Sequence, residues 1–557
     1  MKTLFAGICV LVGAFTVAPA SAATPPLSGA AISQELRTLT TAHAAARVGG
    51  ETVWNNEVDD VYRAAGYAPL WQASPDNDRR ADLLRAALDD AGAHGVATDD
   101  LHLRLLDEMR APSTPAEAAA RDVLLTDAFL RYAAKLRQGA LSTDALGPDW
   151  GIGQESFDPR AALVDAWRNG TFAELLGSLA PPHAQYSRLI DALRRYKEIA
   201  ARGGWQLIPG REEVTLDDRD PRLAVLRQRL SAEGYLGAGG SSSGGDLAAV
   251  RLFQTRHGLD PDGRVGPRTL AELNMSPEQR VAQIAANLER WRHVPRRFGD
   301  EFVTVNAADA TLDFVRDGTT ALHMRVVVGD PGHPTPVLAA HISAITFNPP
   351  WNIPISIATK EMLPRLKRDP HYLAANDIMV MNRPDDPFGL RVNWPRFTRA
   401  NFPFQLQQRP GPRNSLGLIK LEMPNRFDVY LHDTPVKATF SRARRAVSHG
   451  CIRLEHAGEI AQRLLDDDAT WNGATIQEAI AAGETRHVAL ARPVPIYVLY
   501  WTAFVDDDGA VNFREDLYGR DAGLARALSM GHQTSPAAAR AMARIGCPGQ
   551  RLAGTAG

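Results

Sequence analysis

The residues best suited to covalent chemistry lie in one short stretch toward the C-terminal end of the sequence. Cys451 follows a Ser-His-Gly tripeptide, so it lies in a glycine-containing turn whose successive backbone N–H groups can point at one oxyanion. Upstream, residues 428–432 are rich in strand-forming residues and end in His432. A histidine on a rigid strand can accept the thiol proton and produce a thiolate nucleophile. The pattern therefore predicts acyl transfer, with Cys451 as the nucleophile and His432 as its base.

Two other interpretations of these residues compete with catalysis. A lone cysteine is more often a small buried apolar residue than a nucleophile. A zinc site is the second alternative, and its possible nitrogen and sulfur ligands are His432, His449, Cys451 and His456. Their spacing matches neither a Cys-x-x-Cys nor a His-Glu-x-x-His pattern. The sequence therefore favours no metal, and it implies no cofactor.

The stretch resembles the signature of the L,D-transpeptidases, whose YkuD-like catalytic domain remodels bacterial peptidoglycan. That signature consists of a histidine, a spacer, a Ser/Thr-His-Gly-Cys run and an Asn or Arg two positions further on. The residues that fill these positions here are His432, Ser448, His449, Gly450, Cys451 and Arg453.

The resemblance implies a role for each residue of the site. Cys451 attacks the third residue of a tetrapeptide stem, a diamino acid, and expels D-alanine, while His432 accepts and returns the proton. The backbone carbonyl of Asp433 orients His432, and the sequence leaves open whether the Asp433 side chain takes part. Gly450 and His449 belong to the oxyanion-hole turn. The residues expected to contact substrate are Arg453, Ser448, Trp351, Asn352 and Asn414.

Composition bounds the class of protein. With 557 residues, of which 45% are hydrophobic and 23% are charged, the chain can bury several cores, and roughly two or three domains are expected. The formal net charge of −2 gives no overall field that would attract nucleic acid or anionic lipid. Recognition by charge must therefore be local.

The first residues indicate export. Residues 1–22 match the three regions of a secretory signal, so we expect cleavage after Ala22 and a periplasmic mature protein. No permanent membrane span is expected, because no later run approaches the roughly 20 apolar residues that a span requires. Removal of Cys9 leaves Cys451 and Cys547, which do not make a disulfide framework and are not expected to pair.

Changes in periodicity divide the rest of the chain. Residues 33–205 carry apolar residues at three- and four-residue spacing, which predicts helices. Residues 220–275 predict a three-helix unit, and residues 276–300 a connecting helix. The first region resembles the scaffold domain of large Gram-negative L,D-transpeptidases, through VYRAAGYAPLW, RYAAKLRQGAL and YSRLIDALRRYKEIAARGGW. The second resembles a peptidoglycan-binding domain, through FQTRHGLDPDGRVGPRTLAEL, although most of these residues would hold a bundle together in any case.

In the remaining sequence, apolar and polar residues alternate with a period of two. This pattern predicts a β-rich domain over residues 301–521, ending in a hairpin with an Asp-Gly turn, and the resemblance implies that this is the catalytic domain. Residues 355–416 interrupt it with a helical piece and long loops, which is typical of a functional lid and resembles the capping insertion of the same large enzymes. Residues 522–557 are interpreted as a weakly ordered tail. The expected fold class is therefore multidomain α+β.

The resemblance implies a peptidoglycan L,D-transpeptidase whose partners are stem peptides and glycan. The acyl group would pass to the side-chain amine of another stem, which makes a 3→3 cross-link. An L,D-carboxypeptidase would use the same residues with water as the acceptor. A wall-binding scaffold with an idle catalytic site is the alternative from a different functional class, and the sequence does not identify the acceptor.

Overall fold

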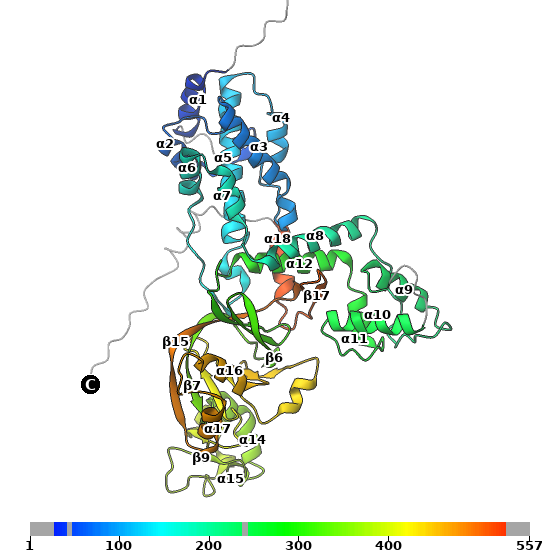
Figure 1. The fold of residues 1–557 in the computed structure, drawn as a ribbon, viewed down its shortest axis with the longest axis vertical. Helices are drawn as coiled ribbons and strands as arrows, with labels where there is room; N and C mark the ends of the chain where they lie inside the picture. Colours follow the sequence, from blue (N-terminus) through cyan, green and yellow to red (C-terminus); the bar gives the residue numbers. More distant parts are fainter. Residues whose placement is uncertain (1–26, 42–46, 237–242, 531–557) are drawn as a thin grey trace, which may run out of the picture.

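The structure is a computed structural model, and it describes residues 27–41, 47–236 and 243–530. The predicted signal segment and Cys547 lie outside the described residues. The chain forms a helical region, a small helical lobe to one side, a sheet domain and a further lobe beyond the sheet (Figure 1). The expected mixture of a helical N-terminal region and a sheet-rich C-terminal domain is confirmed. Among the described residues, no helix has the length and apolarity needed to cross a bilayer.

The N-terminal region is built around one long helix, α5. Thr114 caps its start, Pro115 stands at the first helical position, and all residues at positions 122–136 are buried. Shorter helices therefore surround it. The elements are α1 Gly29–Thr41, β1 Arg47–Val48, β2 Glu51–Thr52, α2 Asn55–Ala64, α3 Pro75–Asp89, α4 Leu103–Glu108, α5 Pro115–Gln138, α6 Pro159–Asn169, α7 Phe172–Leu179 and α8 Ala184–Ala201.

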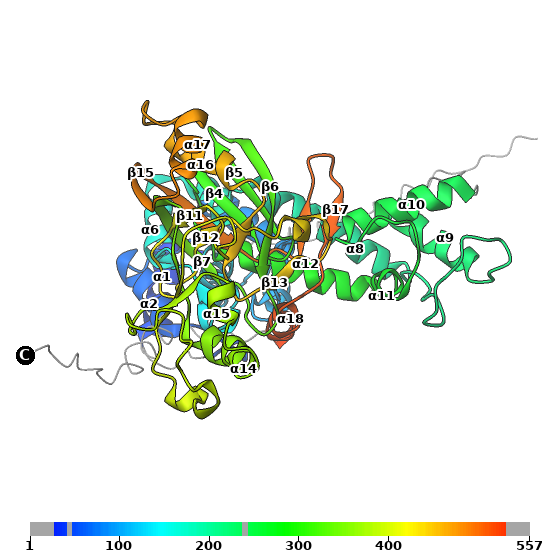
Figure 2. The ribbon, with the colours of Figure 1, turned by 90° about the horizontal axis from the view of Figure 1, so that it is seen from below.

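The predicted three-helix unit forms a lobe with its own small core. Leu226, Phe253 and Leu273 are buried at its centre. Seen from below, the lobe projects to one side of the molecule (Figure 2). Its helices are α9 Leu223–Ala232, α10 Ser243–Arg256 and α11 Pro267–Leu273.

The predicted connecting helix is α12, Pro277–Arg292, and it lies at the centre of the molecule. A capping box between Ser276 and Gln279 begins it. Apolar Leu288 and Trp291 are buried, but so is the charged Glu289, because α12 has neighbours on several sides. The helix therefore joins domains through polar contacts as well as apolar ones.

The sheet domain is a barrel, because its sheet closes on itself. The strand order is β11-β12-β14-β6-β5-β4-β15-β7, and β11 also pairs with β7. Along β4 and β5 buried residues alternate with more exposed ones, because successive side chains point to opposite faces. The strands are β4 Glu301–Asn306, β5 Thr311–Arg316, β6 Thr319–Gly329, β7 Val337–Phe347, β11 Ile419–Glu422, β12 Leu431–His432, β13 Ala446–Ser448, β14 Ile452–Leu454 and β15 Arg486–Leu499, and the helices packed beside them are α16 Ala457–Leu465 and α17 Gly473–Ala481.

The end of the helical region shares this core. Strand β3, Trp150–Gly151, pairs with β7 in parallel, and Tyr186 of α8 is buried in the same cluster as Val303 of β4. The predicted boundary at residue 205 therefore separates two patterns in the sequence but not two cores. Packing of α8 against α12 accounts for this continuity.

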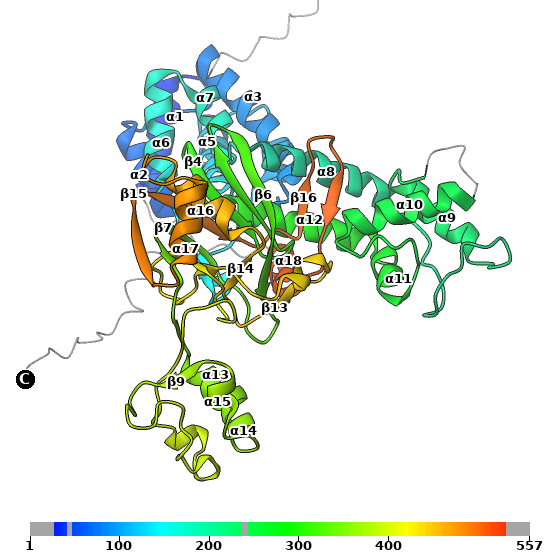
Figure 3. The same cartoon turned by 60° about the horizontal axis from the view of Figure 1, so that its bottom comes forward.

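Residues 355–416, which were predicted to be a capping insertion, lie in a lobe set apart from the barrel (Figure 3). The lobe has its own core around Leu366, Trp394 and Phe404. It also contains a three-stranded sheet that periodicity did not predict. Its elements are β8 Trp351–Asn352, α13 Ile355–Ile357, the π-helical turn η4 Ala358–Met362, α14 Leu363–Leu366, α15 Tyr372–Ala375, β9 Ile378–Val380 and β10 Leu406–Gln408.

The prediction of a weakly ordered tail from residue 522 is wrong as far as residue 530. The chain continues into α18, Arg520–Met530, in which Leu524 is only 2% exposed. Buried Arg290 of α12 lies 2.6 Å from the Asp521 carboxylate, and this ion pair holds α18 in place. The predicted terminal hairpin precedes it, as β16 Ala503–Val505 and β17 Val511–Phe513.

Candidate active site

Two neighbouring parallel strands bring the predicted nucleophile and base together. Leu431 of β12 pairs with Ile452 of β14, and His432 pairs with Arg453. Leu431 and Ile452 are both fully buried. Because side chains alternate along a strand, the residues on either side of this buried pair share the opposite face. Cys451 and His432 therefore lie on one face of the sheet.

The strand that carries the base is shorter than predicted. Residues 428–432 were expected to be extended throughout, but only Leu431–His432 forms β12. Asp428 has a φ of 54°, in the left-handed region, and the Asn425 side chain bonds to the Val429 carbonyl at 2.7 Å. A side-chain-stabilised turn thus replaces the beginning of the strand.

The His432 imidazole is buried and fixed in one tautomer. Its Nδ1 lies 2.5 Å from the backbone carbonyl of Asp433. A carbonyl can only accept, so Nδ1 carries the proton and Nε2 is the basic nitrogen. Burial, reinforced by the charge of Arg453, lowers the pKa of His432 to about 4. At neutral pH the imidazole is therefore neutral and able to accept a proton.

The Cys451 side chain is partly buried. Burial raises the pKa of Cys451, and this effect is partly offset by hydrogen bonds from the Tyr430 backbone and hydroxyl and by the charges of Lys420 and Arg453. The Lys420 ammonium lies 4.4 Å from the centre of the Tyr430 ring. The resting pair is consequently a thiol beside a neutral imidazole, and the groups that stabilise the thiolate are already in position.

The turn before Cys451 is held by hydrogen bonds on both sides. The Ser448 hydroxyl donates to the Cys451 carbonyl at 2.6 Å and accepts from the Gly450 N–H at 3.2 Å. Thr335, in the loop before β7, donates to the Gly450 carbonyl at 2.8 Å. Gly450 has a φ of 107°, which favours glycine. Among the described residues no acceptor engages the Cys451 N–H, which leaves that amide available to an oxyanion.

His449 contacts the capping insertion instead of the thiol. Its Nε2 lies 2.6 Å from the carboxylate of Glu361 in η4. The ring of His333 lies beside it, 4.8 Å away between centroids. The catalytic turn and the cap therefore meet through a polar contact between two half-exposed side chains.

The Asp433 side chain has partners of its own. Its carboxylate accepts from the Leu418 N–H at 3.0 Å and from the Lys437 ammonium at 2.6 Å. The backbone carbonyl of Asp433 is the group that contacts His432 Nδ1, while the negative charge of Asp433 acts on the imidazole by raising its pKa against the effect of burial.

Arg453 is the cation with no carboxylate partner at this site. Within the described part of the chain it forms no ion pair, and its buried Nε has no hydrogen-bond partner. Burial lowers the pKa of Arg453, and the charge of Cys451 works against this. Its position on β14, next to His432, places an unsatisfied donor beside the nucleophile.

The other residues expected to contact substrate divide into two groups. Trp351 lies within hydrogen-bonding reach of the Tyr430 hydroxyl, and Asn352 is exposed and bonds to Gln407 at 2.7 Å. Both residues belong to β8, at the start of the capping lobe. Asn414, by contrast, is 1% exposed, and its amide donates to three backbone carbonyls. Asn414 shapes the loop after β10, just as Ser448 shapes the turn.

Metal binding finds no support in the geometry of the described residues. No group of three or more histidine, cysteine or acidic side chains comes together there in a way that could hold an ion. His449 is engaged by Glu361, and His456 contacts Glu459 instead. The four candidate zinc ligands are thus held by separate contacts.

Sequence reasoning missed Tyr430, Thr335 and Glu361. Tyr430 could have been found, because it stands two residues before His432 and so shares its face of the strand. Thr335 and Glu361 approach the turn from other parts of the chain. No local pattern in the sequence marks either contact.

Family models match three separate parts of the chain. A scaffold domain matches residues 56–193, a peptidoglycan binding domain residues 219–273, and an L,D-transpeptidase catalytic domain residues 300–488. The catalytic match includes both strands of the site. These assignments agree with the modules predicted from sequence patterns.

Comparison with individual proteins points the same way. A Haemophilus influenzae protein assigned as an L,D-transpeptidase is 32% identical over 286 residues, which cover 49% of this chain and 57% of that protein. The match thus spans little more than half of the relative. Two solved structures, an Enterococcus faecium L,D-transpeptidase (12% identity, 37% and 52% coverage, TM-score 0.17) and Mycobacterium tuberculosis L,D-transpeptidase 3 (16%, 36% and 60%, 0.18), are too distant to carry an argument.

Proposed function

We propose that this protein is a cysteine-dependent peptidoglycan L,D-transpeptidase. The premise is that the chain contains an L,D-transpeptidase catalytic domain together with scaffold and peptidoglycan-binding domains. One observation carries the proposal. Cys451 and His432 share a face of adjacent parallel strands, and the Asp433 carbonyl holds the protonated Nδ1 so that Nε2 is the base. This is the geometry that activates a thiol for acyl transfer.

The first half of the reaction forms a thioester. As the Cys451 sulfur bonds to the carbonyl carbon of the third stem residue, the thiol proton passes to His432. The tetrahedral oxyanion receives a hydrogen bond from the Cys451 N–H. When the amide C–N bond breaks, the same proton leaves with the amine of D-alanine.

The second half transfers the acyl group. The side-chain amine of another stem attacks the thioester, its proton passes to His432, and the Cys451 thiol is restored as the new amide forms. The product is a 3→3 cross-link. Tyr430 donates to the thiolate at each stage, because burial and the nearby Cys451 raise the pKa of its hydroxyl and keep it protonated.

Arg453 and the cap would select the substrate. The Arg453 guanidinium, which has no ion pair among the described residues, suits a carboxylate of the stem peptide. Trp351 and Asn352 offer an apolar face and an amide where the cap joins the barrel. A stem peptide would therefore lie between the barrel and the cap. The substrate places the working protein outside the cytoplasm, in agreement with the signal segment expected from its sequence.

Intact mass spectrometry tests the proposal directly. Purified protein would be incubated with a disaccharide-tetrapeptide that carries a diamino acid at position three. We expect a dimeric product and released D-alanine, with both lost in Cys451→Ala and in His432→Ala. The control is Thr434→Ala, a substitution two residues after His432 that leaves both Cys451 and His432 in place.

The outcomes separate three functions. Dimer that depends on Cys451 supports the transpeptidase. Tripeptide without dimer identifies an L,D-carboxypeptidase. If there is no turnover and a carbapenem does not acylate the thiol, the enzyme proposal fails and a wall-binding scaffold remains.

A further inference from the structure

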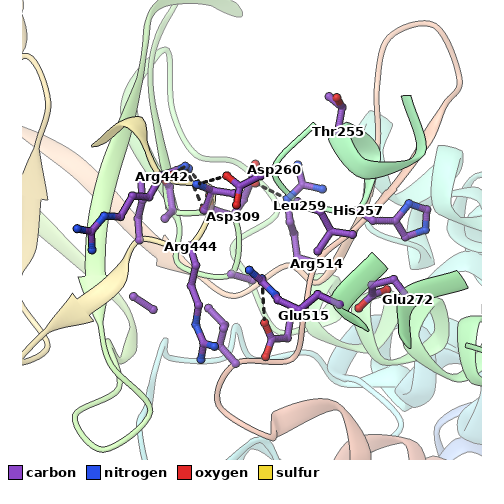
Figure 4. Close-up of a pocket in the computed structure, with 18 of the residues that line it drawn as sticks. Thr255, His257, Leu259, Asp260, Glu272, Asp309, Arg442, Arg444, Arg514 and Glu515 are labelled. Atoms are coloured by element: carbon purple, nitrogen blue, oxygen red, sulfur yellow. Dashed lines mark hydrogen bonds and ion pairs between the residues drawn. The ribbon is translucent and has the colours of Figure 1, made fainter. Parts of the chain in front are cut away.

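A cleft of about 590 Å³ lies between the peptidoglycan-binding lobe and the barrel. One wall comes from the loop between α10 and α11, and the other from the segment that links η7, Lys437–Ser441, to β13. Asp260 accepts a hydrogen bond from the Ala443 N–H at 3.1 Å, which fixes the two walls against each other (Figure 4). The cleft is large enough for a peptide fragment.

The charges that line the cleft do not balance. Its arginines are Arg268, Arg325, Arg442, Arg444, Arg445 and Arg514, and its acidic residues are Asp260, Glu272, Asp309 and Glu515. Each carboxylate is already engaged. Their partners are Ala443 N–H for Asp260, Arg280 for Glu272, Arg514 for Asp309 and Arg268 for Glu515. No carboxylate of the cleft is therefore left to neutralise the remaining cations.

Arg442 and Arg444 are the free cations. Both are exposed, and within the described residues neither guanidinium has an ion pair or a hydrogen bond. Between Arg442 and the turn, Arg445 is occupied differently, because it donates to the backbone carbonyls of Asp309 and Ala310. The cleft therefore presents two unneutralised guanidinium groups, the type of donor that binds carboxylates in a bidentate manner.

The cleft continues into a second hollow on the lobe. Leu259, Asp260 and Arg268 line both the cleft and a neighbouring cavity of about 280 Å³. At its other end the cleft reaches Ala446, the first residue of β13. Five residues of chain from there to Cys451 span at most about 18 Å. A bound polymer could therefore extend from the lobe to the catalytic turn.

We propose that this interdomain cleft binds the free carboxylates of a peptidoglycan stem peptide through Arg442 and Arg444. The inference rests on the proposed function and deepens it. The lobe and the barrel hold one stem of a wall strand in the cleft, close to the stem that Cys451 acylates. The strand is thereby presented by two domains at once, which raises the local concentration of substrate at the turn.

Binding measurements on a Cys451→Ala background test this, because that variant has no turnover. The ligand is a disaccharide-tetrapeptide with free carboxylates, compared with the same fragment after its carboxylates are amidated. We expect Arg442→Gln/Arg444→Gln to weaken binding of the free-carboxylate fragment by about tenfold and to reduce its salt dependence. Binding of the amidated fragment should not change.

A matched control variant also loses two positive charges, but at positions outside the cleft. Arg79 and Arg297 are exposed, have no ion pair among the described residues and do not line the cleft. Arg79→Gln/Arg297→Gln should bind both fragments as the parent does. Equal affinity of parent and cleft variant, equal affinity for the two fragments, or no binding by the parent at low salt would each overturn the inference.

A separate readout distinguishes this failure from failure of the catalytic proposal. In the protein that retains Cys451, a carbapenem reacts at the thiol without needing the cleft. Its rate of acylation should be the same with and without the Arg442 and Arg444 substitutions. A protein that forms dimers but binds fragments independently of these arginines refutes the cleft alone.

Discussion

Cys451 and His432 are both uncharged at neutral pH, and burial is the common cause. Burial raises the pKa of the thiol and lowers that of the imidazole to about 4. An ion pair of the kind found in some cysteine proteases is therefore not the resting state. In the proposed mechanism the proton moves only when the sulfur attacks, and Tyr430, Lys420 and Arg453 would then stabilise the developing negative charge.

The pH profile of acylation should reflect this resting state. His432 must be neutral to accept the proton, and its lowered pKa keeps it neutral down to about pH 4. We expect the rate at which a carbapenem acylates Cys451 to remain level from neutral pH to about pH 5 and to fall by half near pH 4. Intact mass spectrometry of the time course provides the rates.

The control for this profile is His432→Gln. This variant should react slowly, and its rate should show no decrease near pH 4. Its rate should instead rise with pH, as the Cys451 thiol ionises. Circular dichroism at each pH verifies that the fold persists. An acid limb near the ordinary histidine pKa of about 6.5 would show that the imidazole is not shifted.

At the scale of elements, the catalytic turn is held by parts of the chain that are distant in sequence. Thr335 in the loop before β7 fixes the Gly450 carbonyl, and Glu361 in η4 reaches His449. The first contact is buried and rigid. The second joins two half-exposed groups on separate lobes, so it is the contact most easily broken when the cap moves.

Removal of the Glu361 carboxylate should loosen the cap. We expect Glu361→Gln to increase deuterium uptake in residues 358–362. The KM for the disaccharide-tetrapeptide should rise by about two- to fivefold, the factor that corresponds to the free energy of an exposed ion pair. Acylation by a carbapenem, which is too small to need the cap, should be unaffected.

Glu459→Gln is the matched control, because it removes the exposed contact between Glu459 and His456 beyond β14. It should alter neither uptake in η4 nor KM. Unchanged uptake in Glu361→Gln would mean that the cap is held by its other contacts.

At the scale of the whole molecule, α12 holds the domains together through a buried charge. Glu289 is fully buried, and its carboxylate accepts from the backbone of Ala140 and Leu141 and from Arg292 and His293. Burial alone would raise its pKa, but these donors outweigh burial and lower it to about 2. The chain after α5 is thereby fastened to the helix that underlies the barrel.

Glu289→Gln should weaken the contact between α12 and the segment that follows α5. Loss of the charge leaves Arg292 buried without its counterion, which costs about 3 kcal/mol. Amide exchange at Ala140 and Leu141 should accelerate by about a hundredfold at neutral pH. Glu278→Gln, an exposed position in the first turn of the same helix, should leave exchange unchanged.

The sign of the pH dependence follows from the lowered pKa. Glu289 contributes stability above its ordinary pKa of about 4.3, and the contribution is lost as the pH falls toward about 2. The difference between wild type and Glu289→Gln should therefore narrow as the pH decreases below about 4. A difference that stays constant with pH would indicate that packing, and not charge, holds the junction.

Local patterns in the sequence predicted most of the helices and strands and the residues of the candidate site. Helical spacing predicted the N-terminal region and the three-helix lobe, and alternation in twos predicted the barrel strands, because both reflect one buried face of a regular element. A strand histidine followed by a cysteine in a glycine turn predicts His432 and Cys451 as base and nucleophile, and the structure places them on one face of adjacent strands. Tyr430 stands two residues before His432 in the same alternating pattern, but it was not predicted to belong to the site.

Only the tertiary structure decided which distant groups meet. The partners of His449 and Gly450, the contact of the Asp433 carbonyl with His432, and the structural role of Asn414 depend on how loops cross one another. The order of α18 likewise depends on Arg290, which lies more than two hundred residues upstream of Asp521. Periodicity records which side of an element is buried, whereas these contacts depend on what covers it, and the covering element comes from elsewhere in the chain.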